Sequence, residues 1–249
     1  MGVFEFIGLK YLLAAFLLVL TLISGWYPFA KRQQKVSSFP LAEAFASGVF
    51  LGAGLMHMLP DSGEMFREAG YGYPLAALIA GLMLLFLLWF EHFTREKYAQ
   101  KDPKSFVLLP VIMLSVHSLL EGGALGVASN VELFSVLAIA IVGHKWAEGF
   151  ALSVQINQAP DSLARRMSYY IFFALMTPIG LLAGSLIHHD NASLPLLASI
   201  NSLAAGTFLY LGTLHGLSRS VMVEKCCNVR QYSFVLLGFG LMAVIAYWF

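Results

Sequence analysis

Residues 133–154 read "LFSVLAIAIVGHKWAEGFALSV", a segment that is long and apolar enough to cross a lipid bilayer. A spanning helix needs about 20 mostly apolar residues. Near its middle, however, this segment carries His144, Lys145 and Glu148. An acidic or basic side chain at the centre of a membrane helix costs about 2.5–3.5 kcal/mol on insertion scales, and such residues usually mark functional sites. The segment therefore predicts a membrane helix with a polar function.

The whole chain has the composition of an integral membrane protein. Of its 249 residues, 59% are hydrophobic and 12% are charged, and the mean hydropathy is +0.75. These values exclude an ordinary water-soluble domain of this size. Eight runs can span a bilayer, and we expect them to form one all-α polytopic transmembrane domain over residues 1–249. The expected helices cover about residues 7–29, 41–60, 74–90, 106–127, 133–154, 169–187, 194–214 and 233–249.

The distribution of basic residues predicts the orientation in the membrane. Most of the 15 lysine and arginine residues follow the first, third, fifth and seventh runs. Because basic loops remain in the cytoplasm, both termini are expected on the extracytoplasmic side. The first run carries Glu5 at its start and is followed by "KRQQK" instead of a small-residue cleavage site. We therefore expect it to be retained as a helix and not removed as a signal peptide.

Several polar segments are expected outside the helices and without a role in a central site. The longest connection, "EHFTREKYAQKDPK" at residues 91–104, is predicted to be a solvated cytosolic loop or a short helix. Adjacent cysteines are spaced too tightly for an ordinary disulfide, so Cys226 and Cys227 are interpreted as free cytosolic thiols. One outer cluster is interpreted as a solvated loop: His188, His189 and Asp190. Nothing resembles a nucleotide-binding loop, and no nucleic-acid partner is expected.

Two neighbouring runs carry matching pairs of metal-ligating residues. Residues 117–126 read "HSLLEGGALG", with His117 and Glu121 four residues apart, and His144 and Glu148 have the same spacing. Four residues turn an α-helix by about 400°, so each pair lies on one helix face. Facing one another, the pairs would supply two nitrogens and up to four oxygens to one divalent cation. Lys145 can pair with one of the carboxylates when no metal is bound.

Small residues follow each glutamate in these two runs. Residues of this kind let membrane helices approach closely. We therefore expect the small residues to bring the two ligand-bearing helices together: Gly122, Gly123, Ala124, Gly126 and Gly149.

Two further histidines lie where a cation would enter or leave the central site. His57 and Asp61 are one turn apart in "HMLPDS", at the outer end of the second run, and could offer a first, weaker stop. Alternatively, Asp61 ends or caps a helix beyond Pro60. His215 follows the seventh run at its cytoplasmic end, where it could receive an ion leaving inward. The alternative for His215 is an interfacial histidine without a ligand role.

The motifs "HSLLEGGALG" and "HKWAEGFAL" resemble the ZIP (Zrt/Irt-like) family of divalent metal transporters. The stretches "GVFLGAGLMHMLPDS", "MTPIGLLAG" and "AAGTFLYLGTLH" extend the likeness from about Leu41 to His215. The resemblance implies a 3+2+3 arrangement, in which the first and last three helices are inverted repeats around the middle pair. It also implies transport of zinc, and often iron, manganese or cadmium, into the cytoplasm, with no permanent cofactor. Sliding of one helix bundle against another and homodimers are further properties that it implies.

Carried over residue by residue, the resemblance implies a primary metal site at four positions: His117, Glu121, His144 and Glu148. Ser118 falls beside this site. Some family members hold a second metal with acidic residues where this chain has Lys145 and Thr177. Protonated lysine has no lone pair, so we predict a single-metal site in which both glutamates are shared between the metal and Lys145. His215 stands where glutamate is common, and the cytosolic loop lacks a histidine tract.

A different class of function would use the same residues. In an intramembrane zinc-dependent hydrolase, the histidines would hold a catalytic zinc and one glutamate would act as a general base. Such enzymes usually contain an H-E-x-x-H helix, which is absent from this sequence. We therefore predict a transporter and not an enzyme, with the lipid bilayer and a divalent metal ion as its partners. The compact loops favour a bacterial inner membrane.

Overall fold

The computed structural model describes residues 3–30, 39–98, 105–157, 161–186, 194–214 and 228–248. Within these ranges the chain is helical and contains no strand, and eight helices are long and apolar enough to cross a membrane. This confirms the predicted all-α, eight-helix architecture. The elements are α1 (Val3–Ala30), α2 (Pro40–Gly52), the π-helix η1 (Ala53–Met58), α3 (Leu59–Glu68), α4 (Leu75–Tyr98), α5 (Ser105–Val127), α6 (Val131–Asn157), α7 (Leu163–Ser185), α8 (Leu194–Tyr210) and α9 (Val229–Trp248).

The second span differs from its predicted boundaries. It does not end near Pro60 but continues through η1 and α3 to Glu68. The chain widens into a π-helix immediately before the proline, and the Leu59 N–H bonds to the carbonyl of Gly54, five residues earlier. Pro60 then lies at the start of α3, where its missing N–H is tolerated. The prediction that the helix stops here was therefore wrong.

The third span is also longer than predicted. The helix α4 runs on to Tyr98, through much of the segment expected to be a loop or a short helix. Arg95 donates to the carboxylate of Glu91 at 2.5 and 2.8 Å, one turn earlier. Such a pair at i and i+4 supports a helix. The charged composition of this segment therefore reflects a helix that leaves the membrane, not a break in the helix.

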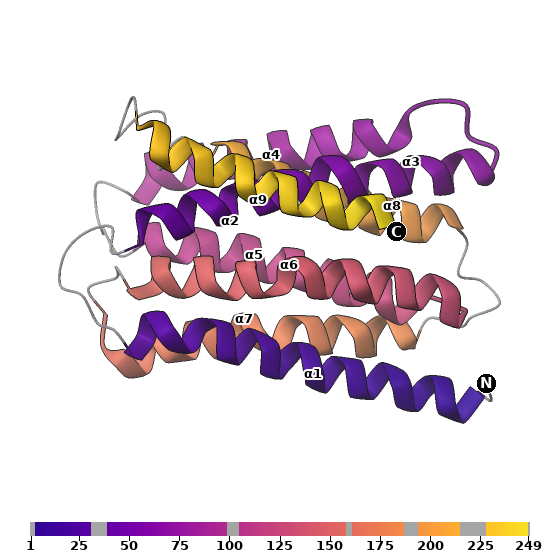
Figure 1. The fold of residues 1–249 in the computed structure, drawn as a ribbon, viewed down its shortest axis with the longest axis horizontal. Helices are drawn as coiled ribbons and strands as arrows, with labels where there is room; N and C mark the ends of the chain where they lie inside the picture. The colour runs from indigo at the N-terminus through magenta and orange to yellow at the C-terminus, as the bar shows by residue number, and fades with distance from the viewer. Residues whose placement is uncertain are drawn as a thin grey trace.

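The helices form two groups that meet at α5 and α6 (Figure 1). In the first group α1 packs on α6 and α5 packs on α7, whereas in the second α2 packs on α9 and α4 packs on α8. Contacts between the groups are fewer and are mainly those of α5 with α8 and of α2 with α6. These pairings interchange when each of the first three spans is exchanged with its counterpart among the last three and the two middle spans, α5 and α6, are exchanged with each other. They are therefore compatible with the inverted 3+2+3 repeat, which stays a prediction.

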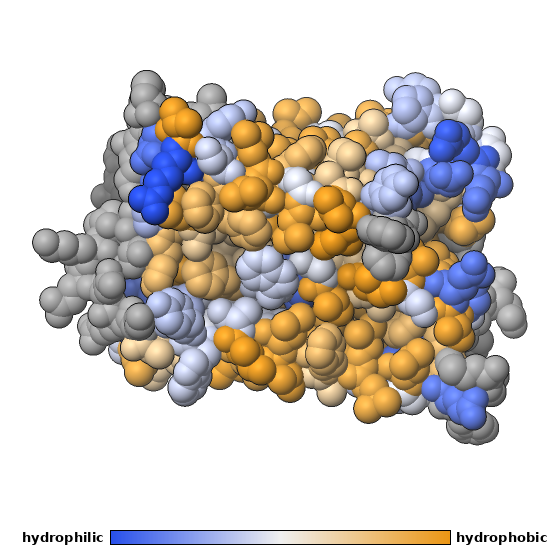
Figure 2. Space-filling model, in the orientation of Figure 1, coloured by the Kyte–Doolittle hydropathy of each residue, from blue (hydrophilic) through white to orange (hydrophobic). Residues whose placement is uncertain are grey.

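The surface and the chain ends fit a membrane protein with an even number of crossings. Hydrophobic residues cover the middle of the visible face, and hydrophilic residues gather toward its two ends (Figure 2). The first helix starts and α9 finishes at the same end of the molecule (Figure 1). The described basic residues Arg95, Lys97, Arg165, Arg166 and Arg230 lie at the opposite end, at the close of α4 and the beginnings of α7 and α9. That this end is cytoplasmic stays a prediction.

The small residues of α5 and α6 have other partners than predicted. A Cβ at Gly122 would collide with the backbone carbonyl of Thr177, and one at Gly126 would also meet the backbone of α7. Gly149 faces α1 and not α5. The residues Glu121 and Gly122 are adjacent, so they lie about 100° apart around the helix. The ligand face and the small-residue face of α5 are consequently different, and the prediction that these glycines join α5 to α6 was wrong.

Candidate metal centre

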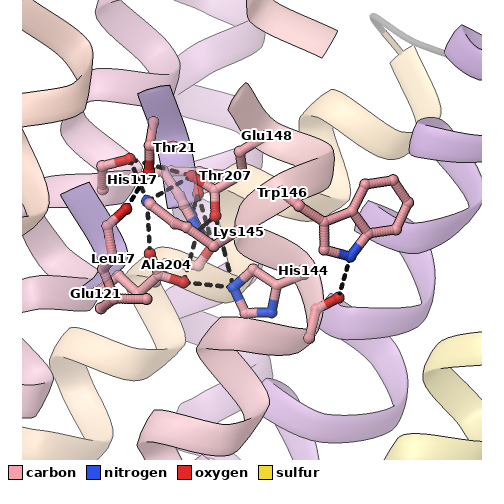
Figure 3. Close-up of polar contacts among 12 residues, drawn as sticks. Leu17, Thr21, His117, Glu121, His144, Lys145, Trp146, Glu148, Ala204 and Thr207 are labelled. Atoms are coloured by element: carbon pink, nitrogen blue, oxygen red, sulfur yellow. Dashed lines mark hydrogen bonds and ion pairs between the residues drawn. The ribbon is translucent and has the colours of Figure 1, made fainter. Parts of the chain in front are cut away.

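The four predicted metal ligands come together between α5 and α6. Each of His117, Glu121, His144 and Glu148 offers one ligand atom, and these atoms all lie within 4.8 Å of one another. Their exposed fractions are 0%, 2%, 1% and 0%, respectively. The side chains point toward one another, whereas the neighbouring Trp146 points away (Figure 3). The spacing of four residues places both members of each pair on the same helix face, as predicted.

The arrangement of ligand atoms suits a small divalent cation. The His117 Nε2 atom is 3.7 Å from the Oε1 atoms of both Glu121 and Glu148, and His144 Nε2 is 3.6 Å from Glu148 Oε1. His144 Nε2 is also hydrogen-bonded to Glu121 Oε1. In tetrahedral zinc sites, bonds of about 2.0–2.1 Å separate the ligand atoms by about 3.3–3.4 Å. Three of the separations are therefore close to those of a tetrahedral site, whereas the hydrogen-bonded pair of His144 and Glu121 would have to widen and the widest separations, up to 4.8 Å, would have to narrow around an ion.

The other oxygen of each carboxylate, Oε2, contacts the Lys145 ammonium. The Lys145 Nζ atom lies 2.9 Å from Glu121 Oε2 and 2.8 Å from Glu148 Oε2. It also donates to Ser118 Oγ at 2.8 Å, and Ser118 donates to Glu148 Oε2 at 3.1 Å. The ammonium thus pairs with both glutamates, the two carboxylates that were predicted to be shared between Lys145 and a metal. Each carboxylate presents Oε1 to the histidines and Oε2 to Lys145.

Residues of α8 orient His117, and sequence reasoning missed them. The His117 Nδ1 atom lies 2.5 Å from Thr207 Oγ1 and 3.2 Å from the carbonyl of Ala204. Thr207 donates its own proton to that carbonyl at 2.6 Å, so its oxygen accepts from His117. Phe208 stacks on the His117 ring at 3.7 Å between centroids and 19° between planes. These partners assign the proton to Nδ1 and leave the Nε2 lone pair facing the carboxylates.

The predicted outer pair is formed but lies apart from the central cluster. His57 Nδ1 is 2.8 Å from Asp61 Oδ2, and the two residues lie in η1 and α3. His57 is buried, and Asp61 is partly exposed. The second span does not end at Asp61, so the helix-ending alternative was wrong. Several predicted features lie outside the described residues: His215, His188, His189, Asp190, Cys226 and Cys227.

The sequence matches a known family over most of its length. The family described as ZIP Zinc transporter matches residues 7–108 and 104–246. The chain is 27% identical to Fe(2+) transport protein 1 of Arabidopsis thaliana, over 84% of this chain and 75% of that protein. It is 25% identical to Zinc transporter ZIP2 of Mus musculus, over 93% of this chain and 95% of that protein. Eight spans, a buried His/Glu cluster and this match agree, and the chain belongs to the ZIP zinc transporter family.

Proposed function

We propose that this protein is a divalent metal carrier that moves zinc into the cytoplasm through the site between α5 and α6. The observation that carries the proposal is the convergence of four ligand atoms within 4.8 Å in the buried centre of an eight-span protein. Two imidazoles and two carboxylates suit Zn²⁺, Fe²⁺ and Mn²⁺ better than a soft ion such as Cu⁺. The zinc and iron transporters among the relatives support the same substrate class.

The proposed carrier holds one ion at a time, because Lys145 supplies the positive charge on the far side of both carboxylates. A protonated lysine cannot act as a ligand, and its contacts with both Oε2 atoms leave only the Oε1 atoms for a metal. Thr177, at the position where the family resemblance implies an acidic ligand in some members, is neutral. Metal content per purified protein molecule tests this part. Two tightly bound ions at the membrane centre would overturn it.

The proposed route to this site begins at the pair of His57 and Asp61. An imidazole and a carboxylate 2.8 Å apart offer a weak first site to an arriving cation. The partly exposed Asp61 makes this pair more accessible than the central ligands. The inward direction and the exit at His215 rest on the family resemblance and on the distribution of basic residues.

Uptake of radioactive zinc into proteoliposomes tests the function. Glu148→Ala removes one ligand and one negative charge, and we expect it to abolish uptake. Glu64→Ala is the matched control, because that glutamate is mostly exposed at 68% of its side chain. Undiminished zinc uptake by Glu148→Ala would refute the site. Flux across the membrane without covalent change of any substrate separates a carrier from an intramembrane hydrolase.

A further inference from the structure

The metal centre lies on the boundary between the two helix groups. All four ligands belong to α5 and α6 of the first group, but the partner of His117 Nδ1 belongs to α8 of the second. We propose that Thr207 is a positioning residue: it holds His117 in its metal-binding form only while the two groups keep the register of this structure, so that metal affinity depends on their relative position. This inference rests on the proposed transport function, because it explains how a bound ion is released.

The Thr207 hydroxyl determines which nitrogen of the His117 ring carries the proton. Both His117 and Thr207 are 0% exposed, so water does not replace a lost hydrogen bond. With Thr207 Oγ1 accepting from Nδ1, the Nε2 atom has a free lone pair beside the two carboxylates. Without that acceptor, an Nδ1 proton keeps only the more distant Ala204 carbonyl at 3.2 Å, whereas a proton on Nε2 is donated to a carboxylate. The second form has no lone pair at the metal position.

His117 and Thr207 are each fixed within their own helix group by close backbone contacts. A Cβ at Gly206, next to Thr207, would collide with the Ala80 carbonyl, so α8 lies directly against the α4 backbone. The contact of Gly122 with the Thr177 carbonyl holds α5 against α7 in the same way. Interlocked backbones of this kind resist sliding. Each partner therefore moves with its own group, and the contact of His117 with Thr207 crosses from one group to the other.

The burial of the four ligands requires the two helix groups to move during transport. The four ligands are 0–2% exposed, so a hydrated ion reaches or leaves them only when the structure rearranges. The boundary between the two groups runs between α5 and α8, beside these ligands, and the groups touch each other most at this pair. Movement there opens the site without separating the interlocked helix pairs. The same movement takes Thr207 away from His117 and weakens the hold on the ion.

Thr207→Val tests the inference, because it keeps the shape of the side chain and removes the hydroxyl oxygen that accepts from His117 Nδ1. Mutation of a residue that hydrogen-bonds the non-coordinating nitrogen of a metal-binding histidine typically lowers metal affinity 10- to 100-fold. We expect zinc to bind the purified variant about 10- to 100-fold more weakly, with a raised KM for uptake and an undiminished maximal rate. Thr207→Ser should restore both values. The matched control is Thr21→Val, since Thr21 is also fully buried but its hydroxyl donates to the Leu17 carbonyl of its own helix.

A readout without metal separates this inference from the proposed function. Nitrogen-15 spectra of the His117 ring in the metal-free protein should show a proton on Nδ1, and Thr207→Val should shift it toward Nε2. A wild-type ring protonated on Nε2 would overturn the inference, even if Thr207→Val fails to fold. So would unchanged zinc affinity in Thr207→Val, or failure of Thr207→Ser to restore it. Absence of zinc flux in the wild type, with the ring spectra as expected, would instead refute the proposed function.

Discussion

Replacement of Lys145 by methionine should make the protein depend on zinc for its stability. Methionine is unbranched and of similar length, so the variant removes the charge with little change in shape. Lys145 is 1% exposed and pairs with both Glu121 and Glu148, at 2.9 and 2.8 Å. Removal of one partner of a buried ion pair costs about 3–5 kcal/mol. Here two carboxylates lose their shared cation, so we expect the upper part of that range in the metal-free protein.

Zinc should offset most of this loss, because a divalent cation between the Oε1 atoms neutralises the same two carboxylates. A ligand at 100 times its dissociation constant stabilises the folded state by about 2.7 kcal/mol. Each tenfold gain in affinity adds about 1.4 kcal/mol at fixed zinc concentration. Without the repulsion from the Lys145 ammonium, the variant should bind zinc more tightly than the wild type. The increase in stability on adding zinc should therefore be larger in the variant.

The assay is the free energy of unfolding in bicelles, measured with a chelator and again with saturating zinc. Lys10→Met provides the matched control. Lys10 is also buried, but it donates to the carbonyls of Gly126 and Ala128 at 2.7 and 3.0 Å, at the end of α5. This control should lose about 1–3 kcal/mol without any dependence on zinc. If Lys145→Met is as stable as the wild type in chelator, or gains no more from zinc than the control, the reasoning is wrong.

Three further predictions concern packing, protonation and the outer pair. Gly122→Ala should destabilise the fold by about 1–3 kcal/mol through its collision with the Thr177 carbonyl; the adjacent Gly123→Ala, whose Cβ meets nothing within 4 Å, should change the unfolding free energy far less. Zinc affinity measured by calorimetry should be lower in acid than at neutral pH, because imidazole and carboxylate ligands bind metal only when deprotonated; an unchanged affinity would contradict this. Asp61→Asn should raise the KM for zinc uptake without changing equilibrium binding at the central site, and an unaltered KM would exclude the outer pair from the route.

The sequence was sufficient for the eight-helix architecture and for the central cluster of two histidines and two glutamates, for the same physical reason. In a bilayer, apolar runs of the right length have few alternatives to a helix. Ionisable residues within such runs are costly enough to stand out, as His117, Glu121, His144 and Glu148 do. The helix boundaries were less predictable, because a proline such as Pro60 usually marks the end or a kink of a helix. The structure instead places a π-helix before the proline, and no single residue type predicts a π-helix.

The partners of the glycines and of His117 could not be predicted, because they depend on which helix lies beside which. The glycines of α5 are ordinary small residues in the sequence, and only the packing assigns them to α7. Thr207 is a neutral hydroxyl that can bond to its own helix backbone, so nothing in its surroundings distinguishes it from Thr21 or Thr213. Its contact with His117 joins residues 90 positions apart.

The position of Lys145 resolves an apparent conflict within the metal centre. A lysine one residue from a ligand would compete with a cation if both used the same carboxylate oxygens, and the sequence does not say which oxygen each cation contacts. In the fold, Lys145 reaches Glu148 from three residues away on α6 and Glu121 from across the helix pair, and in both cases it contacts Oε2. The histidines contact or approach Oε1. Two cations can therefore share two carboxylates without sharing an oxygen, so we expect the lysine to limit the site to one metal without blocking it.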